Sequence, residues 1–205
     1  EELFAPANKG KIEVLTELRD TVGVIMMAQG VDITKFTKDQ YYNALDFLQK
    51  KIADGFIRQV KGNDYKEDLI SGDAIAVIGW SGDAFQLAAE NDGKFDFAIP
   101  ESGGTISADN FIIPSTVTAE TKPKVEKLIN YYYDPAVAAK VAAYVNYICP
   151  VEGAQAEMEK IDPTLAKSEL IFPTAKTQSK LHVFRNLTPA EETEFTDAFQ
   201  KATGN

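Results

Sequence analysis

Short apolar runs alternate along this chain with longer segments of helical periodicity, and this alternation is what most limits the possible folds. The run Ala74–Ile78 is apolar throughout, as expected of a strand buried on both faces of a sheet. Because helical segments separate such runs, the pattern predicts an α/β fold around a mostly parallel sheet. The predicted strands are Lys11–Leu15, Phe56–Val60, Ala74–Ile78, Phe95–Ile99 and Asn110–Ile113.

Helix ends are marked by capping residues. Thr37 with Gln40, and Thr188 with Glu191, form capping-box patterns, and the second predicts a final helix to about Ala202. Asp134 followed by Pro135 is typical of a helix start. Helices are also expected over residues 22–29, 65–70 and 81–91, and over a stretch in which Val125, Leu128, Ile129 and Tyr132 share one face. A turn is expected at 101–104, whereas 150–187 is expected to be irregular because of Pro150, Pro163 and Pro173.

The charge balance limits the possible partners. The 205 residues include 31 acidic and 21 basic ones, for a net charge of −10, which argues against nucleic acid as a partner. The charge suits a cationic ligand, although a solvated acidic surface explains it as simply.

No apolar run is long enough for a membrane span. The start, Glu1–Phe4, lacks signal-peptide features, so the chain is expected to be mature, truncated or cytoplasmic.

The sequence offers little for catalysis or metal binding. Its one cysteine, Cys149, cannot form an internal disulfide and is most simply a small buried hydrophobe. The one histidine, His182, has no partner for a metal-ligand set and nothing that links it to Cys149 as a catalytic base. We therefore expect no catalytic residue, no metal and no cofactor.

Two segments at strand–helix junctions are candidates for ligand binding. Glu17 and Asp20 lie three apart in a predicted first helical turn, where both carboxylates face the same way and attract an ammonium group. The alternative is that they only complement the helix dipole. In the second segment, glycines flank Trp80 and Ser81, and Asp83 follows. An indole face can hold an amine, but Trp80 could equally be a core residue with Ser81 or Asp83 as a helix cap.

Two further positions are weaker candidates. Ser107 and Asp109 precede the predicted strand Asn110–Ile113, and Tyr147 follows a predicted helix. Taken alone, each is explained as simply by an ordinary turn or core position.

The ordered set of these motifs resembles the spermidine/putrescine-binding family of bacterial extracellular solute-binding proteins. No single motif is specific, but their order through most of the chain is. The motifs are Lys9-Gly10-Lys11, Arg19-Asp20, Ser71-Gly72-Asp73, Val77–Asp83, Ile99–Gly104, Asp109, Ile113-Pro114, Leu128–Asn130, Asp134–Ala138, and Tyr147 with Pro150.

The resemblance implies a type II periplasmic-binding-protein-like fold of two α/β lobes that close on the ligand. It places Glu17 and Asp20 where the family has carboxylates for amine nitrogens, and Trp80 where an aromatic packs along the aliphatic chain. Asp83 matches an acid of putrescine-type members, Asp109 the acid that binds a primary ammonium, and Tyr147 a cleft tyrosine. Two positions differ from the family's pattern: Ser107 replaces the usual aromatic residue, and Arg185 stands where an amide is common.

The resemblance also implies that this chain lacks most of the first lobe. Residues 1–106 and 158–205 would then form the second lobe, and 107–157 would be a crossing segment of the first. Because that segment would lack its sheet neighbours, we expect it to expose apolar surface or to pair with another copy of the chain. A cation at Arg185 would repel a polyamine unless it is paired with a carboxylate or turned away.

The function that the resemblance implies is that of a receptor, not an enzyme. It would bind spermidine or putrescine outside the cytoplasm, in the periplasm or as a cell-surface lipoprotein, and deliver it to the permease subunits of an ABC importer. A receptor for another amine or mixed-charge solute and a sensory module on the same fold remain alternatives. A glycosidase would need one of two paired carboxylic acids to have a raised pKa, and nothing in the sequence singles out such a pair.

Overall fold

The computed structural model describes residues 2–204 and divides them into two compact units. Unit 1 contains the residues up to Trp80, then Ala98–Ser107, and those from Lys180 onward. Unit 2 contains Ser81–Phe97 and Ala108–Ser179.

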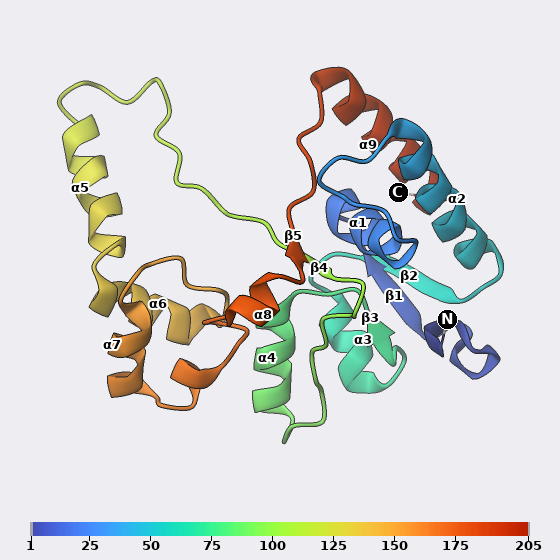
Figure 1. Ribbon diagram of the computed structural model, residues 1–205, viewed down its shortest axis with the longest axis horizontal. Coiled ribbons are helices and arrows are strands. Elements are labelled where there is room, and N and C mark those ends of the chain that lie inside the picture. The colour runs from blue at the N-terminus through green and yellow to red at the C-terminus, as the bar shows by residue number, and fades with distance from the viewer. Residues whose placement is uncertain (1, 205) are drawn as a thin grey trace. The chain divides into compact units, whose positions relative to one another are not determined.

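A three-stranded parallel sheet lies at the centre of unit 1. Strand β1 (Ile12–Leu15) lies between β2 (Ile57–Lys61) and β3 (Ala76–Val77), and both pairings are parallel (Figure 1). All four residues of β1 are buried, as expected of a middle strand. A second pair of short parallel strands joins β4 (Gly104–Thr105) to β5 (Leu181–His182). These findings confirm the α/β class with a parallel sheet.

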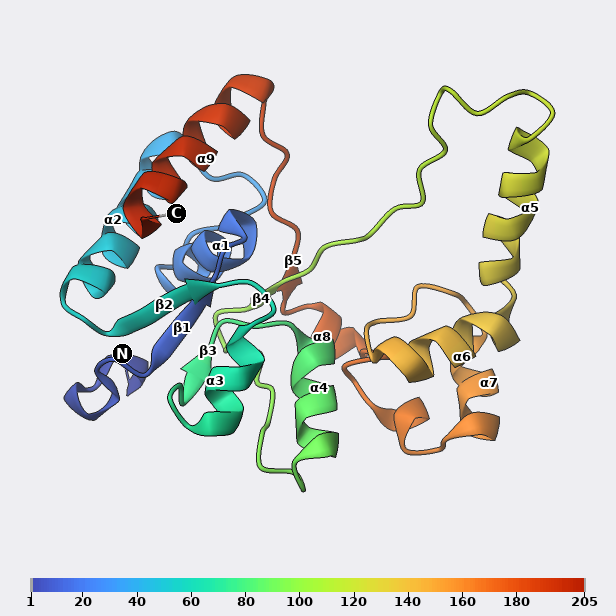
Figure 2. The ribbon, with the colours of Figure 1, turned by 180° about the vertical axis from the view of Figure 1, so that it is seen from behind.

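Helices cover the sheet of unit 1 and supply most of its core. Helix α1 (Leu18–Ala28) directly follows β1, and α2 (Lys38–Ala53) lies beside the C-terminal helix α9 (Pro189–Thr203), as both views show (Figure 2). The rings of Tyr41 and Phe195 stack with centroids 3.9 Å apart, and the Tyr41 hydroxyl donates to the Phe195 carbonyl at 2.9 Å. A short helix, α3 (Tyr65–Ser71), connects β2 to β3.

The predicted helix caps of both units are confirmed. Thr37 and Thr188 each accept a hydrogen bond from the backbone three residues on, and Gln40 and Glu191 complete the two capping boxes. The Asp134 side chain accepts from two backbone amides at the start of its helix. These local patterns are readable in sequence because they satisfy backbone donors within one turn.

Unit 2 is helical in the part that the structure describes. Its main helices are α4 (Ser81–Glu90), α5 (Lys122–Tyr132), α6 (Pro135–Val145) and α7 (Ala154–Ile161), with a single turn, α8 (Ala175–Gln178). Alanines of α6 pack against Met158 and Ile171 in a small core. Cys149 packs against this core, as predicted, but it is only half-buried and not fully buried.

Four predictions of local structure were wrong in whole or in part. Phe95–Ile99 and Asn110–Ile113 are not strands, and no strand among the described residues pairs with either. Ala74–Ile78 contributes only the two paired residues of β3, and Ile75 is half exposed. The 150–187 region contains α7, because its prolines lie outside that helix and limit its length without interrupting it.

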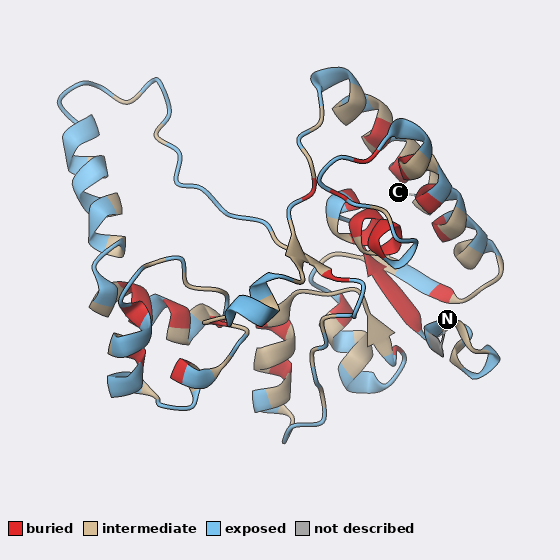
Figure 3. Cartoon of the chain, in the orientation of Figure 1, coloured by how far each residue is buried: buried red, intermediate tan, exposed pale blue. Residues whose placement is uncertain are grey.

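Unit 2 exposes a large apolar surface, as predicted for residues 107–157. Helix α5 has no buried side chain and is almost entirely exposed (Figure 3). Exposed fractions reach 84% for Tyr144 and 82% for Ile112. The other large apolar side chains exposed in this region are Phe111, Leu128, Tyr131, Tyr133, Val141 and Tyr147. An apolar helix face without a neighbour gains nothing from folding unless another surface covers it.

We expect the isolated chain to self-associate as its concentration rises, because association removes this apolar surface from water. Sedimentation velocity would show a larger species that the double substitution Leu128→Gln/Tyr144→Ser reduces. Val183→Ser, which alters an exposed apolar residue of unit 1, is the matched control. A chain that stays monomeric throughout would contradict the expectation.

The assignment of 107–157 to a crossing segment between lobes stays a prediction, because the compact units reflect packing within this chain alone.

Among the described residues no helix has the length and hydropathy of a membrane span.

Candidate functional site

The junction between β1 and α1 places Asp20 in the first turn of α1. The helix begins at Leu18, with Glu17 as its N-cap residue. The Thr21 hydroxyl donates to the Leu15 carbonyl at 2.7 Å in a buried position, which fixes the helix to the end of the strand. Glu17 is exposed and accepts a hydrogen bond from the Thr16 hydroxyl, whereas Asp20 is half-buried.

The Asp20 carboxylate receives a hydrogen bond on each oxygen. Trp80, which follows β3, donates its indole Nε1–H to Asp20 Oδ2 at 3.2 Å. The Thr105 hydroxyl on β4 donates to Oδ1 at 3.1 Å. Each carboxylate oxygen has two lone pairs, so both can still accept from an ammonium group. The two neutral donors fix the orientation of the carboxylate without neutralising its charge.

Trp80 is half-buried, which excludes the reading of this residue as a sealed core side chain. The structure therefore brings together Asp20 and Trp80, two residues that the sequence placed sixty positions apart. Thr105 was missed as a site residue, because a two-residue strand leaves no periodic signal in the sequence.

A second cluster lies within unit 2, around Tyr147. Asp83 is in the first turn of α4 and is 9% exposed. The Tyr147 ring packs directly on Gly82, where a Cβ atom would come within 2.5 Å of the ring. Only glycine therefore allows this approach at position 82.

The tyrosine hydroxyl lies in an acidic environment. Burial, followed by the charge of Asp83, raises the pKa of Tyr147 to about 12, and the Asp109 charge acts in the same direction. A hydrogen bond with the Asp83 backbone partly offsets this rise. Asp83, Asp109 and Tyr147 thus lie near one another, with Asp109 exposed. Ser107, in unit 1, is also exposed.

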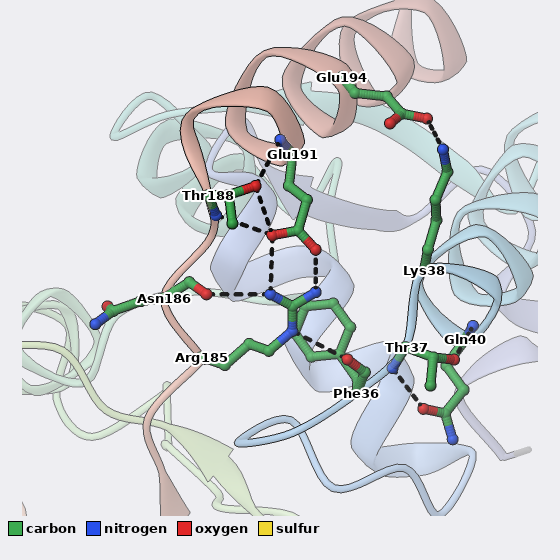
Figure 4. A network of polar contacts seen from close by, with 9 residues as sticks. All are labelled: Phe36, Thr37, Lys38, Gln40, Arg185, Asn186, Thr188, Glu191 and Glu194. Atoms are coloured by element: carbon green, nitrogen blue, oxygen red, sulfur yellow. Dashed lines mark hydrogen bonds and ion pairs between the residues drawn. The ribbon is translucent and has the colours of Figure 1, made fainter.

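Arg185 is paired with a carboxylate, which is the arrangement that relieves its repulsion of a cationic ligand. Its guanidinium donates to both oxygens of Glu191, at 2.7 and 3.2 Å, and to the carbonyls of Phe36 and Asn186 (Figure 4). It also lies 4.2 Å from the centroid of the Phe36 ring. The Arg185 pair holds the pKa of Glu191 at about 2. Arg185 therefore connects α9 to the loop before α2.

A hollow of about 660 Å³ in unit 1 contains none of the predicted site residues. It lies beside the end of α1 and is lined by Met27, Ala28, Gly30–Thr34, Ser102 and His182. Among the described residues, no group of three His, Cys, Asp or Glu side chains is arranged to hold a metal ion. The clusters around Asp20 and Tyr147 combine carboxylates with aromatic rings, which suits an amine. In the hollow, the carboxylate of Asp32 is already paired with Lys35 at 3.1 Å.

Comparison with known proteins finds relatives among periplasmic binding proteins. The chain is 25% identical over 195 residues to the putrescine-binding periplasmic protein PotF of Escherichia coli K12, covering 93% of this chain and 51% of that protein. It is 26% identical over 179 residues to the spermidine/putrescine-binding periplasmic protein of the same organism, covering 86% and 48%. The chain thus spans about half the length of the curated relatives it matches.

Solved structures share the fold. A putative spermidine/putrescine ABC transporter protein from Listeria monocytogenes matches with a TM-score of 0.83 and 24% identity, over 98% of this chain and 59% of that one. The spermidine/putrescine substrate-binding protein PotD of Streptococcus pneumoniae matches with a TM-score of 0.79 and 21% identity, over 98% and 60%. At these identities the match shows the fold alone, and it confirms the periplasmic-binding-protein-like class.

The family model described as bacterial extracellular solute-binding protein matches residues 1–173 of the 205. The resemblance seen in the ordered motifs is therefore confirmed, and the chain belongs to the family of bacterial extracellular solute-binding proteins.

Proposed function

We propose that this chain binds a polyamine, spermidine or putrescine, as part of the extracytoplasmic receptor of an ABC importer. The observation that carries the proposal is the Asp20 carboxylate, which Trp80 and Thr105 orient while its charge stays unneutralised. The names of the relatives support the choice of ligand, since they include putrescine- and spermidine/putrescine-binding proteins.

The ligand contacts follow from charge and shape. Amines of this class are protonated at neutral pH, and each charge-assisted hydrogen bond to a carboxylate contributes roughly 1.5–3 kcal/mol. We propose that Asp20, with Glu17 beside it in sequence, binds one ammonium group and that Trp80 packs along the methylene chain. Asp83, Asp109 and Tyr147 are the proposed contacts of unit 2, and Ser107 is a proposed neighbour of the ligand. These groups select for a cation and against a sugar or an anion.

The structure does not favour the mixed-charge alternative. That reading needed Arg185 to contact a ligand carboxylate, but its donors already bind Glu191 and two backbone carbonyls. We therefore leave Arg185 out of the proposed contacts. Delivery to permease subunits, and an extracytoplasmic location, are parts of the same proposal.

We expect calorimetric titration of the chain with spermidine or putrescine to show binding that Asp20→Asn weakens about tenfold or more. The physical reason is the loss of the charge that makes the hydrogen bond to ammonium strong. Asp109→Asn should weaken binding by a comparable amount, which corresponds to about 1.4 kcal/mol or more.

A matched control separates specific binding from attraction to an acidic protein. Asp39→Asn removes an exposed carboxylate from α2 and should leave the affinity unchanged. Equal losses in all three variants, or heat with an unrelated solute and none with either amine, would contradict the proposed ligand. Raising the salt concentration should weaken the wild type and Asp39→Asn alike.

A further inference from the structure

The middle strand of the unit 1 sheet carries a buried carboxyl group that the proposed site does not use. Glu13, on β1, is 0% exposed. Neither of its oxygens makes a hydrogen bond of normal geometry to a residue that the structure describes. A buried carboxylate without such bonds is costly, so the group must bind a proton or be compensated by nearby charges.

Charged groups face Glu13 from the elements around it. From β2, Arg58 Nε lies 3.7 Å from Glu13 Oε1, too far for a hydrogen bond, while Arg58 Nη2 pairs with Asp73 at 3.2 Å. Lys61, also on β2, forms an ion pair with Asp68 of α3. The other neighbouring strand, β3, contributes only Ala76 and Val77.

These surroundings favour a proton on Glu13. Burial, aided by the neighbouring Asp68 as hydrogen-bond partner and as negative charge, raises the pKa of Glu13 to about 7, against the effects of Lys61 and Arg58. The pKa of Asp68 is lowered, first by Lys61 and then by Glu13. A protonated Glu13 can therefore donate to an ionised Asp68, and the pair exchanges its proton with solvent near neutral pH.

Helix α3 also holds Trp80. The backbone N–H of Trp80 donates to the hydroxyl of Tyr65 at 3.2 Å, and the two rings lie 6.2 Å apart. Tyr65 is 1% exposed, and a Cβ atom at Gly79 would lie 3.1 Å from its ring, so glycine allows the close approach. Tyr65 and Asp68 are three residues apart on α3 and therefore share one side of the helix.

We propose that α3 is a proton-sensitive support for Trp80, in which Tyr65 positions the indole and a proton shared by Glu13 and Asp68 holds the helix against β1. When the proton leaves for solvent, the Glu13 carboxylate of β1 and the neighbouring Asp68 carboxylate of α3 are both negative. Their repulsion loosens α3, and Tyr65 transmits the change to Trp80. Tyr65 is a positioning residue in this account, since it acts on ligand only through Trp80.

The test uses the fact that Trp80 is the only tryptophan in the chain. Its fluorescence, recorded without ligand across neutral pH, should change with a midpoint near 7 in the wild type. Glu13→Gln should abolish this transition. Asp68→Asn should move the midpoint to lower pH, because it removes the negative charge and the best acceptor beside Glu13.

Two controls exclude other causes. Glu67→Gln removes an exposed carboxylate from the same helix and should leave the transition unchanged. His182→Asn removes the one histidine, a residue type that titrates in the same range, and should also retain the transition. A transition that survives Glu13→Gln, or that His182→Asn abolishes, would overturn the proposal, as would a wild type without any transition.

Tyr65→Phe tests the positioning role. It should reduce the fluorescence change while the free energy of unfolding keeps its dependence on pH, since Glu13 still titrates. A full-size fluorescence change in Tyr65→Phe would show that α3 does not act through this hydroxyl.

The consequence for binding rests on the proposed function. If spermidine is the ligand, its affinity should fall several-fold as pH rises through the same midpoint in the wild type, but not in Glu13→Gln. Because the fluorescence titration needs no ligand, failure of spermidine binding and failure of the proton-sensitive support are distinguishable.

Discussion

Replacement of Glu13 by glutamine should stabilise the chain by about 3 kcal/mol at about pH 8 and change its stability little at about pH 4. The folded-state pKa of Glu13 is raised from 4.5 to about 7. Below pH 4.5, Glu13 is protonated in both the folded and the unfolded chain. Between the two values the unfolded chain releases it while the folded chain keeps it, so the free energy of unfolding falls as pH rises, and it levels off above about 7.

Glutamine has nearly the shape of protonated glutamic acid but cannot ionise, so the free energy of unfolding of the variant should not fall in this way as pH rises. Denaturant unfolding of the wild type and Glu13→Gln at a series of pH values would measure the difference directly. Glu17→Gln, at an exposed position two residues beyond β1, is the matched control and should give curves parallel to the wild type. Parallel curves for Glu13→Gln would show that Glu13 is not the group that titrates.

Arg185→Ala should lower the free energy of unfolding by about 2–3 kcal/mol. The Arg185 and Glu191 side chains are only 19% and 26% exposed, and the guanidinium also packs on the Phe36 ring. Removing it leaves the Phe36 carbonyl and Oε1 of Glu191 without the hydrogen bonds that Arg185 donates. Arg185→Lys keeps the positive charge but loses the planar guanidinium group. Its free energy of unfolding should lie between those of the wild type and Arg185→Ala.

The neighbouring pair Arg19–Glu192 is the matched control, because it also pairs an arginine with a glutamate of α9 but its side chains are 45% and 44% exposed. Arg19→Ala should therefore lower the free energy of unfolding by less than about 1 kcal/mol.

The Glu191 pKa of about 2 also makes the effect of Arg185→Ala on stability depend on pH. The stabilisation by this pair is present above the ordinary glutamate pKa and is lost as pH falls toward 2, so Arg185→Ala should be less acid-sensitive than the wild type. Equal losses in Arg19→Ala and Arg185→Ala would contradict this account.

Much of the fold follows from local patterns. The capping boxes at Thr37 and Thr188 and the Asp134-Pro135 start place three helices within a residue or two, because each satisfies its backbone donors within one turn. The errors concern strands. Asn110–Ile113 has the composition of a strand but no strand beside it, and a strand exists only where a neighbour supplies its hydrogen bonds.

In the candidate site, too, the sequence indicated single residues, whereas their contacts depend on tertiary packing. Asp20 and Trp80 were singled out because each follows a strand, yet their hydrogen bond depends on the parallel pairing of β1 and β3. From the sequence, Arg185 could be paired with a carboxylate or turned away from the ligand. Only the packing of α9 showed that it is paired, and that Glu191 is the partner. Tyr65, Thr105 and the burial of Glu13 carry no sequence signal of their own.

By itself, therefore, the sequence determined the α/β class, the helix ends, and the family through the order of its motifs, since these depend on neighbours along the chain. Only the tertiary structure decided which donors orient Asp20, that Trp80 keeps an exposed face, and that a carboxyl group on β1 lies buried beside Asp68. The reason is physical. Burial, desolvation and long-range hydrogen bonds arise between segments far apart in the chain, and no local pattern encodes which of them will meet.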